Sequence, residues 1–395
     1  MRLPVFAPLF LACALGLPWS IASAADLDSA LAKIKAVGAK GEGHTAANAA
    51  LKELRETTTK DLMAILAAMD GANPIACNWL RSVAEAAVDR GAAQGQTLPV
   101  KELEAYFHEH HHSPQGRRFA YELIASVDPS AEARLIPTCL NDESTELRRD
   151  AVAMLLKNAE AAEKSGDTAA ALRMTSEAFT AARLPEQVKA IAEKLQKLGK
   201  EVDVPSHFGL LQNWSLIGPF DHTDSKAFDV AYAPESSVDL GAKLMGKKGE
   251  VEWKPVVTTK PDALVDVNEA LGKEKFAVAY ALHEFTSDKD QDIEVRYGSP
   301  NATKVWVNGE LVAAYDVYHA GYELDQYRGK GKLKQGKNQI LVKICQNNQQ
   351  EQWAQDWVFM LRVCDRLGTA VLSTDRPAVK VEAPPAPPTP DAPAK

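Results

Sequence analysis

The chain has 395 residues, of which 46% are hydrophobic and 25% charged, and its formal net charge is −8. These fractions are those of an ordinary globular protein, and the length predicts about two domains. The acidic balance disfavours nucleic acid and anionic membrane surfaces as partners, because both require a basic face.

The first residues have the pattern of an export signal. Arg2 is followed by an apolar run over 3–17, and Ala22-Ser23-Ala24 has the small-x-small form that signal peptidase cuts. The run is shorter than the ~18 uninterrupted apolar residues of a membrane span, and no other stretch reaches that length. We therefore predict a signal peptide over 1–24, a mature protein that is periplasmic or secreted, and no membrane span.

Residues 25–200 carry the 3.6-residue hydrophobic period of amphipathic helices. Val188, Ile191 and Leu195 follow it between Pro185, which is typical of a helix start, and Gly199, which is typical of a helix end. Breakers stand at Asn73-Pro74, Leu98-Pro99, Ser113-Pro114 and Asp128-Pro129. Successive short helices with short links cannot bury their apolar faces alone, so we predict a stacked α-helical-repeat domain over 25–200.

Two segments of this region resemble known repeat families. The stretch 142–156 is similar to a HEAT-type repeat helix, and the pair of helices expected over 168–198 resembles a TPR hairpin. The resemblance implies a scaffold whose concave helical face presents a surface to a protein partner.

Beyond residue 204 the hydrophobic period changes to two, which is typical of half-buried strands. The alternating sets include Ile340, Val342 and Ile344, and then Phe359, Leu361 and Val363. Asn308-Gly309 between two such runs favours a type I′ hairpin turn. Successive strands without intervening helices predict an antiparallel β-sandwich over 205–375, so that the fold class is multidomain α plus β.

The stretch 305–311 and the stretch 333–342, with Gly336 and Asn338, resemble the galactose-binding-like jelly roll, in the form attached to family 2 glycoside hydrolases as a sugar-binding domain. The run from 214 to 365 also resembles uncharacterised secreted bacterial proteins that join helical repeats to this sandwich. The resemblance implies a jelly-roll architecture and a binding role without catalysis.

The ends of the sandwich region carry two further expectations. Residues 376–395 are rich in proline, which predicts a disordered tail. Cys345 and Cys364 lie on the last two predicted strands; if these strands form a hairpin, Cys345 faces Trp357, and the thiols lie beyond disulfide reach. We therefore expect both thiols to be free and buried.

The run His108-Glu109-His110-His111-His112 contains the H-E-x-x-H pattern of zinc proteases. On a helix, His108 and His112 would share one face and hold zinc, with Glu109 as general base. A run of four histidines satisfies this pattern by accident, Ser113-Pro114 interrupts the helix at once, and no third ligand has a recognisable motif. We therefore expect a solvated helix end and no metal site, with His108 and His112 as weak candidates. Phosphate, dinucleotide and serine-nucleophile motifs are absent from the sequence, so we expect no cofactor and no enzyme activity.

The most informative polar segment is the loop 346–357, in which amide side chains alternate with two tryptophans. Amides that donate and accept beside an aromatic face are what a sugar ring requires. The candidate ligand-binding residues in this loop are Asn347, Gln349, Glu351 and Trp353, and those in the similar segment 318–327 are His319, Asp325, Gln326 and Tyr327. The structural alternative places the aromatics in the core and uses the amides to cap a long loop. It is favoured for Trp357, and for Trp214 and Trp306, and equally weighted for Trp353.

Three hypotheses follow for function. The first is a non-catalytic extracytoplasmic protein whose sandwich loops bind a glycan or a cell-envelope polysaccharide. The second is a protein–protein scaffold that binds no sugar. The third, which the arguments above disfavour, is a zinc hydrolase that uses the histidine run.

Overall fold

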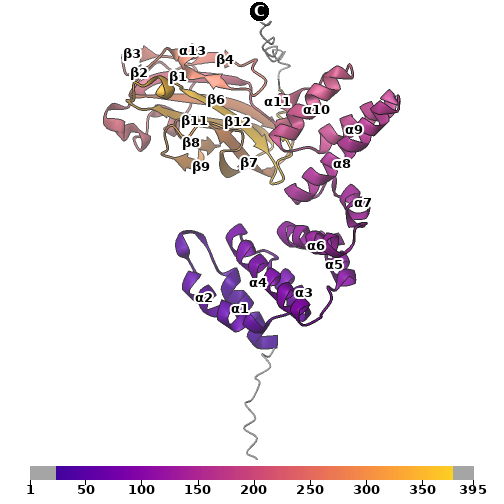
Figure 1. Cartoon of the computed structure of the whole chain (residues 1–395). Coiled ribbons are helices and arrows are strands. Elements are labelled where there is room, and N and C mark those ends of the chain that lie inside the picture. The colour runs from indigo at the N-terminus through magenta and orange to yellow at the C-terminus, as the bar shows by residue number, and fades with distance from the viewer. Residues whose placement is uncertain (1–23, 377–395) are drawn as a thin grey trace, which may run out of the picture. The chain divides into compact units, whose positions relative to one another are not determined.

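A computed structural model of the chain describes residues 24–376 (Figure 1). The segments 1–23 and 377–395, on which the signal peptide and the proline-rich tail were predicted, lie outside the described residues. The chain divides into two compact units, Met1–Leu135 and Ile136–Lys395. The first is helical and the second contains helices and antiparallel sheets, which confirms the α plus β class.

The N-terminal unit consists of short helices separated by prolines and glycines. They are α1 (Ala24–Lys35), α2 (His44–Glu53), α3 (Leu62–Ala68), α4 (Pro74–Ala93), α5 (Val100–His108), α6 (Pro114–Val127) and α7 (Ala131–Leu135). Two of the predicted breakers are helix starts: the side chains of Asn73 and Ser113 accept hydrogen bonds from backbone N–H groups of the first turn, and a proline follows each cap. Within 24–376, no helix is both long and apolar enough to cross a membrane.

The C-terminal unit begins with helices that the sequence analysis assigned to the first domain. Its helices are α8 (Thr145–Lys164), α9 (Thr168–Ala181), α10 (Pro185–Lys197), α11 (Val204–Phe208), α12 (Ala233–Ser236) and α13 (Val267–Leu271). Val188, Ile191 and Leu195 of α10 join one buried cluster with Phe208 and Leu210, which lead into the first strand. Helices therefore continue to Phe208 and the first strand begins at Asn213, whereas the compact units divide between 135 and 136.

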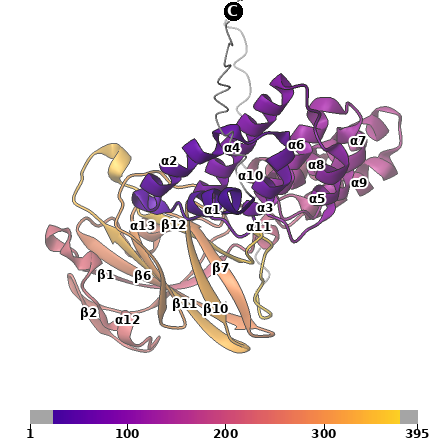
Figure 2. The same cartoon turned by 90° about the horizontal axis from the view of Figure 1, so that it is seen from below.

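The strands form two larger sheets and a hairpin, and all their pairings are antiparallel (Figures 1 and 2). They are β1 (Asn213–Asp221), β2 (Leu244–Gly246), β3 (Gly249–Val251), β4 (Lys254–Val257), β5 (Val265–Asp266), β6 (Ala277–Ser287), β7 (Gln291–Gly298), β8 (Ala302–Val307), β9 (Glu310–Tyr315), β10 (Tyr327–Leu333), β11 (Gly336–Gln346) and β12 (Val358–Cys364). The six-stranded sheet has the order β4-β1-β6-β11-β8-β9, and the four-stranded sheet has the order β10-β7-β12-β5.

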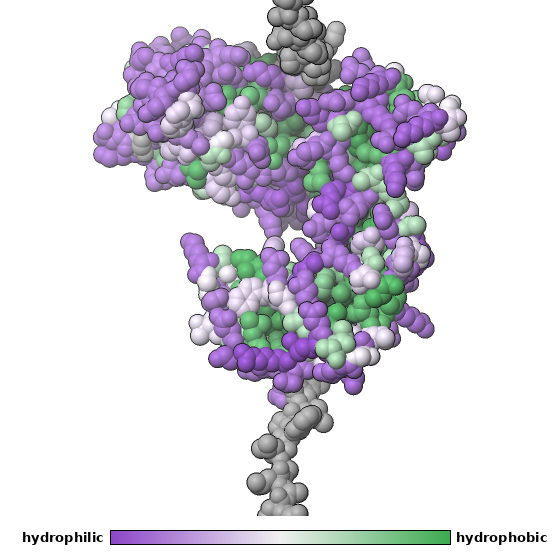
Figure 3. All heavy atoms as spheres, viewed as in Figure 1, coloured by the Kyte–Doolittle hydropathy of each residue, from purple (hydrophilic) through white to green (hydrophobic). Residues whose placement is uncertain are grey.

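The main core lies between these two sheets, and it contains Trp214 and Trp357 together with Phe359. A second cluster, with Trp306 and Tyr280, covers the other face of the six-stranded sheet beneath the segment 227–253. Burial on both faces explains the continuous apolar runs over 277–282 in β6 and 340–342 in β11. In the face drawn in Figure 3, the sandwich is mainly hydrophilic, and hydrophobic residues gather over the helices of the N-terminal unit.

The Asn-Gly hairpin forms as predicted, with positive φ at both Asn308 (53°) and Gly309 (81°). The Asn308 amide donates to Oδ1 of the buried Asn338, 2.8 Å away, and its own Oδ1 accepts from the backbone N–H of Gln339. Asn338 also donates to the carbonyls of Lys334 and Gly336, which closes the turn before β11. The residues that carry the jelly-roll resemblance therefore stabilise two turns and lie at the far end of the strands from Asn347.

The last two strands do not form a hairpin, which corrects one expectation. Strand β11 pairs with β6 and β8 in the six-stranded sheet, whereas β12 pairs with β7 and β5 in the other sheet. The chain between them therefore crosses from one sheet to the other, and the indole Nε1 of Trp357 donates to the carbonyl of Ile344, 3.3 Å away. Cys345 and Cys364 are free buried thiols, and burial raises the pKa of Cys345 to about 12.

Candidate functional site

The loop 347–357 lies at the edge of the sandwich where several connections meet. The backbone N–H of Phe276, just before β6, donates to the carbonyl of Asn347 at 3.0 Å. Asn301, between β7 and β8, donates from Nδ2 to the carbonyl of Asp356 at 3.1 Å. The backbone N–H of His319, between β9 and β10, donates to the carbonyl of Pro300. Two connections distant in sequence therefore bond to the loop directly, and the connection that carries His319 is bonded to one of them.

Trp353 projects from this loop into solvent. It lies in a 3-10 turn, Gln352–Ala354, and is 61% exposed, whereas Trp357 is fully buried. The next residue, Ala354, is buried, and its carbonyl accepts a hydrogen bond of 2.6 Å from Nζ of Lys275. Burial lowers the pKa of Lys275 against the opposing charge of Glu351. The hydrogen bond from Lys275 thus fixes the turn on the protein side while the indole faces solvent.

The His319 ring packs against the indole, and two amide side chains are linked to it through hydrogen bonds. The imidazole of His319 packs edge-on against Trp353, with ring centroids 4.9 Å apart and planes at 88°. Nδ2 of Asn347 donates to Nε2 of His319 at 2.8 Å and to Oε1 of Gln349 at 3.1 Å. With Nε2 acting as acceptor, His319 carries its proton on Nδ1. The structure therefore brings together four of the predicted residues: Trp353, His319, Asn347 and Gln349.

Glu351 belongs to the same loop but is exposed. Its carbonyl accepts from the side-chain amide of Gln355, which also donates to the carbonyl of Gln350. These bonds close the loop on itself and define the backbone that presents Trp353. The surface formed by Trp353, His319, Asn347, Gln349 and Glu351 is called the Trp353 surface below; it offers one apolar ring face bordered by amide, imidazole and carboxylate groups.

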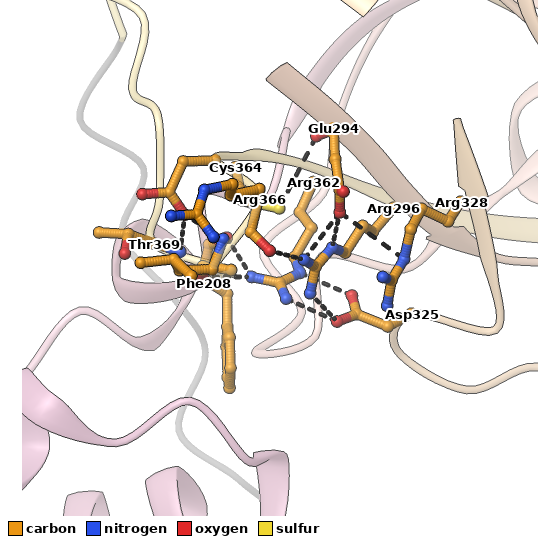
Figure 4. A network of polar contacts seen from close by, with 12 residues as sticks. Phe208, Glu294, Arg296, Asp325, Arg328, Arg362, Cys364, Arg366 and Thr369 are labelled. Carbon is orange, nitrogen blue, oxygen red and sulfur yellow. Dashed lines mark hydrogen bonds and ion pairs between the residues drawn. The ribbon is translucent and has the colours of Figure 1, made fainter. Parts of the chain in front are cut away.

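Asp325 has a structural environment that the sequence analysis did not foresee (Figure 4). Both of its carboxylate oxygens accept from the buried Arg362, each at 2.6 Å, and Oδ2 also accepts from Arg296 at 3.1 Å. Burial alone would raise the pKa of Asp325, but the hydrogen bonds and charges of Arg362 and Arg296 outweigh it and hold the pKa below its ordinary value of 3.8. Both oxygens of the carboxylate are thus engaged by the two arginines.

Gln326 and Tyr327 are likewise engaged by the sandwich. Gln326 accepts from the backbone N–H of Ser299 at 3.0 Å and donates to the carbonyl of Gly321, so it fixes the connection that carries His319. Tyr327 stacks on Tyr315 with ring centroids 4.3 Å apart. These contacts give both side chains a positioning or packing role.

The buried charges of the sandwich were missed because each lies at an outward position of an alternating strand. Arg362 is only 1% exposed, because α11 covers it and the carbonyl of Phe208 accepts from it. Lys343 is fully buried, donates to Glu235 at 2.8 Å, and lies beneath the segment that covers the six-stranded sheet. A charged residue within an otherwise apolar strand is the one signal in the sequence that points to them.

The histidine run of the N-terminal unit does not continue the helix. Helix α5 ends at His108, and the next residue, Glu109, is extended (φ −87°, ψ 97°). His108 and His112 therefore do not share a helical face, and the group of potential metal ligands that the described residues form here is Glu109, His111 and His112. Of the two weak metal candidates named from the sequence, His112 belongs to this group and His108 does not.

A hollow of about 150 Å³ lies elsewhere on the sandwich. It is lined by Leu211, Asn213, His283, Glu284, Ser373, Asp375 and Arg376, none of which belongs to the Trp353 surface. The Trp353 surface is thus a platform bordered by polar groups and not part of this hollow.

No protein-family model and no curated protein matches the sequence. Solved structures with partial likeness include a beta-glucosidase from Kluyveromyces marxianus in complex with glucose (14% identity, 22% of this chain and 11% of that chain, TM-score 0.19). An anti-sigma factor domain-containing protein shares 12% identity over 42% of this chain and 46% of its own, with a TM-score of 0.25. A family 35 carbohydrate binding module from Clostridium thermocellum shares 13% identity over 26% of this chain and 86% of its own, with a TM-score of 0.18.

The chain spans less than half the length of the first two of these structures. TM-scores this low carry no argument about the fold or the ligand of this chain. The interpretation of the Trp353 surface rests on its own geometry.

Proposed function

We propose that this protein is a non-catalytic binding protein that takes a carbohydrate ligand on the Trp353 surface. The observation that carries the proposal is the exposure of Trp353 on a loop whose backbone carbonyls accept hydrogen bonds from Lys275 and Gln355. An exposed indole gains stability only when a partner covers it, because burying apolar surface is worth about 25 cal/mol per Å². A sugar ring covers such a face with its C–H groups.

The polar groups beside the ring support the same class of ligand. Gln349 is partly exposed on the same loop as Trp353, and Asn347 holds it by two hydrogen bonds. Amides pair with hydroxyl groups as donors and as acceptors, which matches the hydroxyl edge of a sugar. Asn347 is buried and pairs within the protein, so the side-chain NH₂ of the partly exposed Gln349 is the amide group that a ligand would meet. A glycan or cell-envelope polysaccharide fits this surface better than an apolar ligand, which would cover that donor without pairing it.

The absence of catalysis is part of the proposal. A glycosidase needs a carboxylic acid whose pKa is raised by shielding from water, in addition to a second carboxylate. Glu351 is exposed, and Asp325 has its pKa lowered by two arginines. Neither environment suits a general acid.

The export pattern at 1–24 supports a periplasmic or secreted location, and a glycan of the cell envelope is accessible there. The helix pairs of 25–200 support a HEAT- or TPR-like role in which the helices bind a protein partner. This scaffold role is the second candidate, and the apolar residues visible over the N-terminal helices in Figure 3 favour it.

A glycan array followed by titration of the selected glycan tests the proposal on the mature chain. We expect Trp353→Ala to lower affinity at least tenfold, which corresponds to about 1.4 kcal/mol, and to leave the melting temperature nearly unchanged because the ring is exposed. Trp214→Ala is the matched control: this ring is buried between the sheets, so its loss costs about 3–5 kcal/mol of stability. If Trp353→Ala unfolds the protein or binds as tightly as the parent, the loop is structural and the scaffold role takes its place.

A further inference from the structure

Three potential metal ligands converge in the N-terminal unit just after α5. The chain leaves the helix at His108 and turns back, with the backbone N–H of His112 donating to the carbonyl of Glu109 at 3.0 Å. This turn places the carboxylate of Glu109 beside the rings of His111 and His112. The convergence depends on the end of the helix and is therefore different from the H-E-x-x-H arrangement.

The distances between the three ligand atoms match those around a tetrahedral ion. Oε2 of Glu109 lies 3.3 Å from Nε2 of His112 and 3.6 Å from Nε2 of His111, and all three atoms lie within 4.8 Å of one another. In a tetrahedral zinc site with bonds of about 2.0–2.1 Å, neighbouring ligand atoms are about 3.4 Å apart. Two of the three edges are therefore already close to the required length.

Asp70, at the end of α3, orients the better buried of the two imidazoles. Its Oδ2 lies 2.7 Å from Nδ1 of His112, and its Oδ1 accepts from the backbone N–H of Ser113 at 2.7 Å. The ring of Tyr106 stacks on His112 with centroids 3.8 Å apart and planes at 16°. A carboxylate that holds the far nitrogen of a histidine is the usual outer partner of a metal ligand, because it fixes the tautomer and the ring plane.

In this arrangement an imidazole nitrogen faces a carboxylate oxygen. When Nδ1 of His112 donates to Asp70, the lone pair of Nε2 faces the carboxylate of Glu109 across 3.3 Å. Two acceptors at this distance repel each other unless a proton on Nε2 or a metal ion lies between them. A metal ion at the centre of the group supplies a positive charge and uses both lone pairs.

We propose that Glu109, His111 and His112 bind one divalent transition-metal ion, with Asp70 as the outer partner of His112. Imidazole and carboxylate ligands in a tetrahedral arrangement select zinc over magnesium or calcium. Glu109 serves as a ligand and not as a base, so the site is distinct from that of a zinc protease. The ion joins the turn before α6 to the end of α3 through Asp70 and stabilises the N-terminal unit.

The experiment uses the full mature chain without an affinity tag, stripped of metal and titrated with Zn²⁺ and with Co²⁺. Calorimetry gives the stoichiometry, and the visible absorption of Co²⁺ reports a tetrahedral site. The run of histidines offers matched controls: we expect one ion per chain in the parent, in His108→Gln and in His110→Gln. We expect His111→Gln, His112→Gln and Glu109→Gln to lose the tetrahedral spectrum.

Asp70→Asn tests the outer partner separately. The loss of a carboxylate behind a histidine ligand lowers metal affinity about 10- to 100-fold, and we expect that loss with the stoichiometry kept at one. A thermal melt with and without Zn²⁺ measures how much the ion stabilises the parent. The result of this melt is independent of the glycan titration of the Trp353 surface. The proposal is overturned if His108→Gln or His110→Gln weakens binding as much as His111→Gln, which would mark an adventitious histidine tract. It is also overturned if Zn²⁺ leaves the melt of the parent unchanged, in which case a protonated His112 bridges the two carboxylates.

Discussion

Asp325→Asn is a sharp test of the claim that Asp325 stabilises the sandwich and does not bind ligand. Asparagine keeps the shape of the side chain, and it tolerates the positive φ of this residue (67°), so that the negative charge is the property removed. The side chain of Asp325 is 26% exposed, and its main partner, Arg362, is buried. The substitution therefore leaves a guanidinium group without its counter-charge.

The expected loss of stability depends on the hydrogen bonds that Arg362 and Arg296 retain in Asp325→Asn. Removal of one partner of a buried ion pair costs about 3–5 kcal/mol. Arg362 retains hydrogen bonds to the carbonyls of Phe208 and Gly368, and Arg296 retains Glu294 at 2.7 Å. We therefore expect a loss of about 2–3 kcal/mol at pH 7, which corresponds to a decrease of about 4–12 °C in melting temperature for a unit of this size.

The pH dependence gives the reasoning a second check. Because the folded-state pKa of Asp325 lies below 3.8, its stabilisation is present above that pH and is lost as the pH falls through the folded-state pKa. Urea unfolding followed by tryptophan fluorescence, from pH 7 down to about pH 3, should show parent and Asp325→Asn converging at the acid end. The control is Asp292→Asn, whose ion pair with Lys332 is exposed (85% and 79%) and is worth less than about 0.5 kcal/mol. Equal stability of parent and Asp325→Asn at pH 7, or a difference that persists unchanged in acid, would refute the argument.

Two further predictions concern the limits of the sandwich and its turns. A fragment over 136–376 should fold on its own. A fragment over 205–376 should melt at lower temperature and bind a hydrophobic dye, because the loss of α8–α10 exposes Phe208 and Leu210. Equal melting temperatures of the two fragments would show that α8–α10 are dispensable. Asn338→Ala should lower the free energy of chemical unfolding by about 2–3 kcal/mol, because it leaves buried backbone groups of the turn unpaired. Asn348→Ala, in the exposed loop, should leave the stability unchanged, and equal effects of the two substitutions would contradict the prediction.

The features predicted correctly from the sequence are those decided by neighbouring residues. The Asn308-Gly309 turn follows from backbone preferences of two residues, and the helix starts at Pro74, Pro114 and Pro185 follow from a missing N–H donor. The buried positions Val188 and Ile191 likewise follow from the period of one helix. None of these depends on the rest of the chain.

The features that escaped prediction depend on distant partners. Strands β11 and β12 look like a hairpin in the sequence, yet their other neighbours draw them into different sheets. Asp325 resembles a ligand residue until Arg362, thirty-seven positions later, occupies both of its oxygens. The sequence favoured a core position for Trp357, which is buried, but left Trp353 open, because its exposure depends on how the loop crosses between the sheets. Glu109 was considered only as a general base and His111 received no role, because the turn that brings them together begins directly after His108.

The order of strands has a consequence for how the protein behaves at high concentration. The outer strands of a sheet carry unpaired backbone groups that another chain can extend. At one such margin, β4 contains Pro255, which has no N–H to offer. At another, β10 carries the exposed cations Arg328, Lys330 and Lys332 on one face, so that a second copy would bring like charges together. Both margins resist strand addition by a second copy, and the strands at the other two margins of these sheets are β9 and β5.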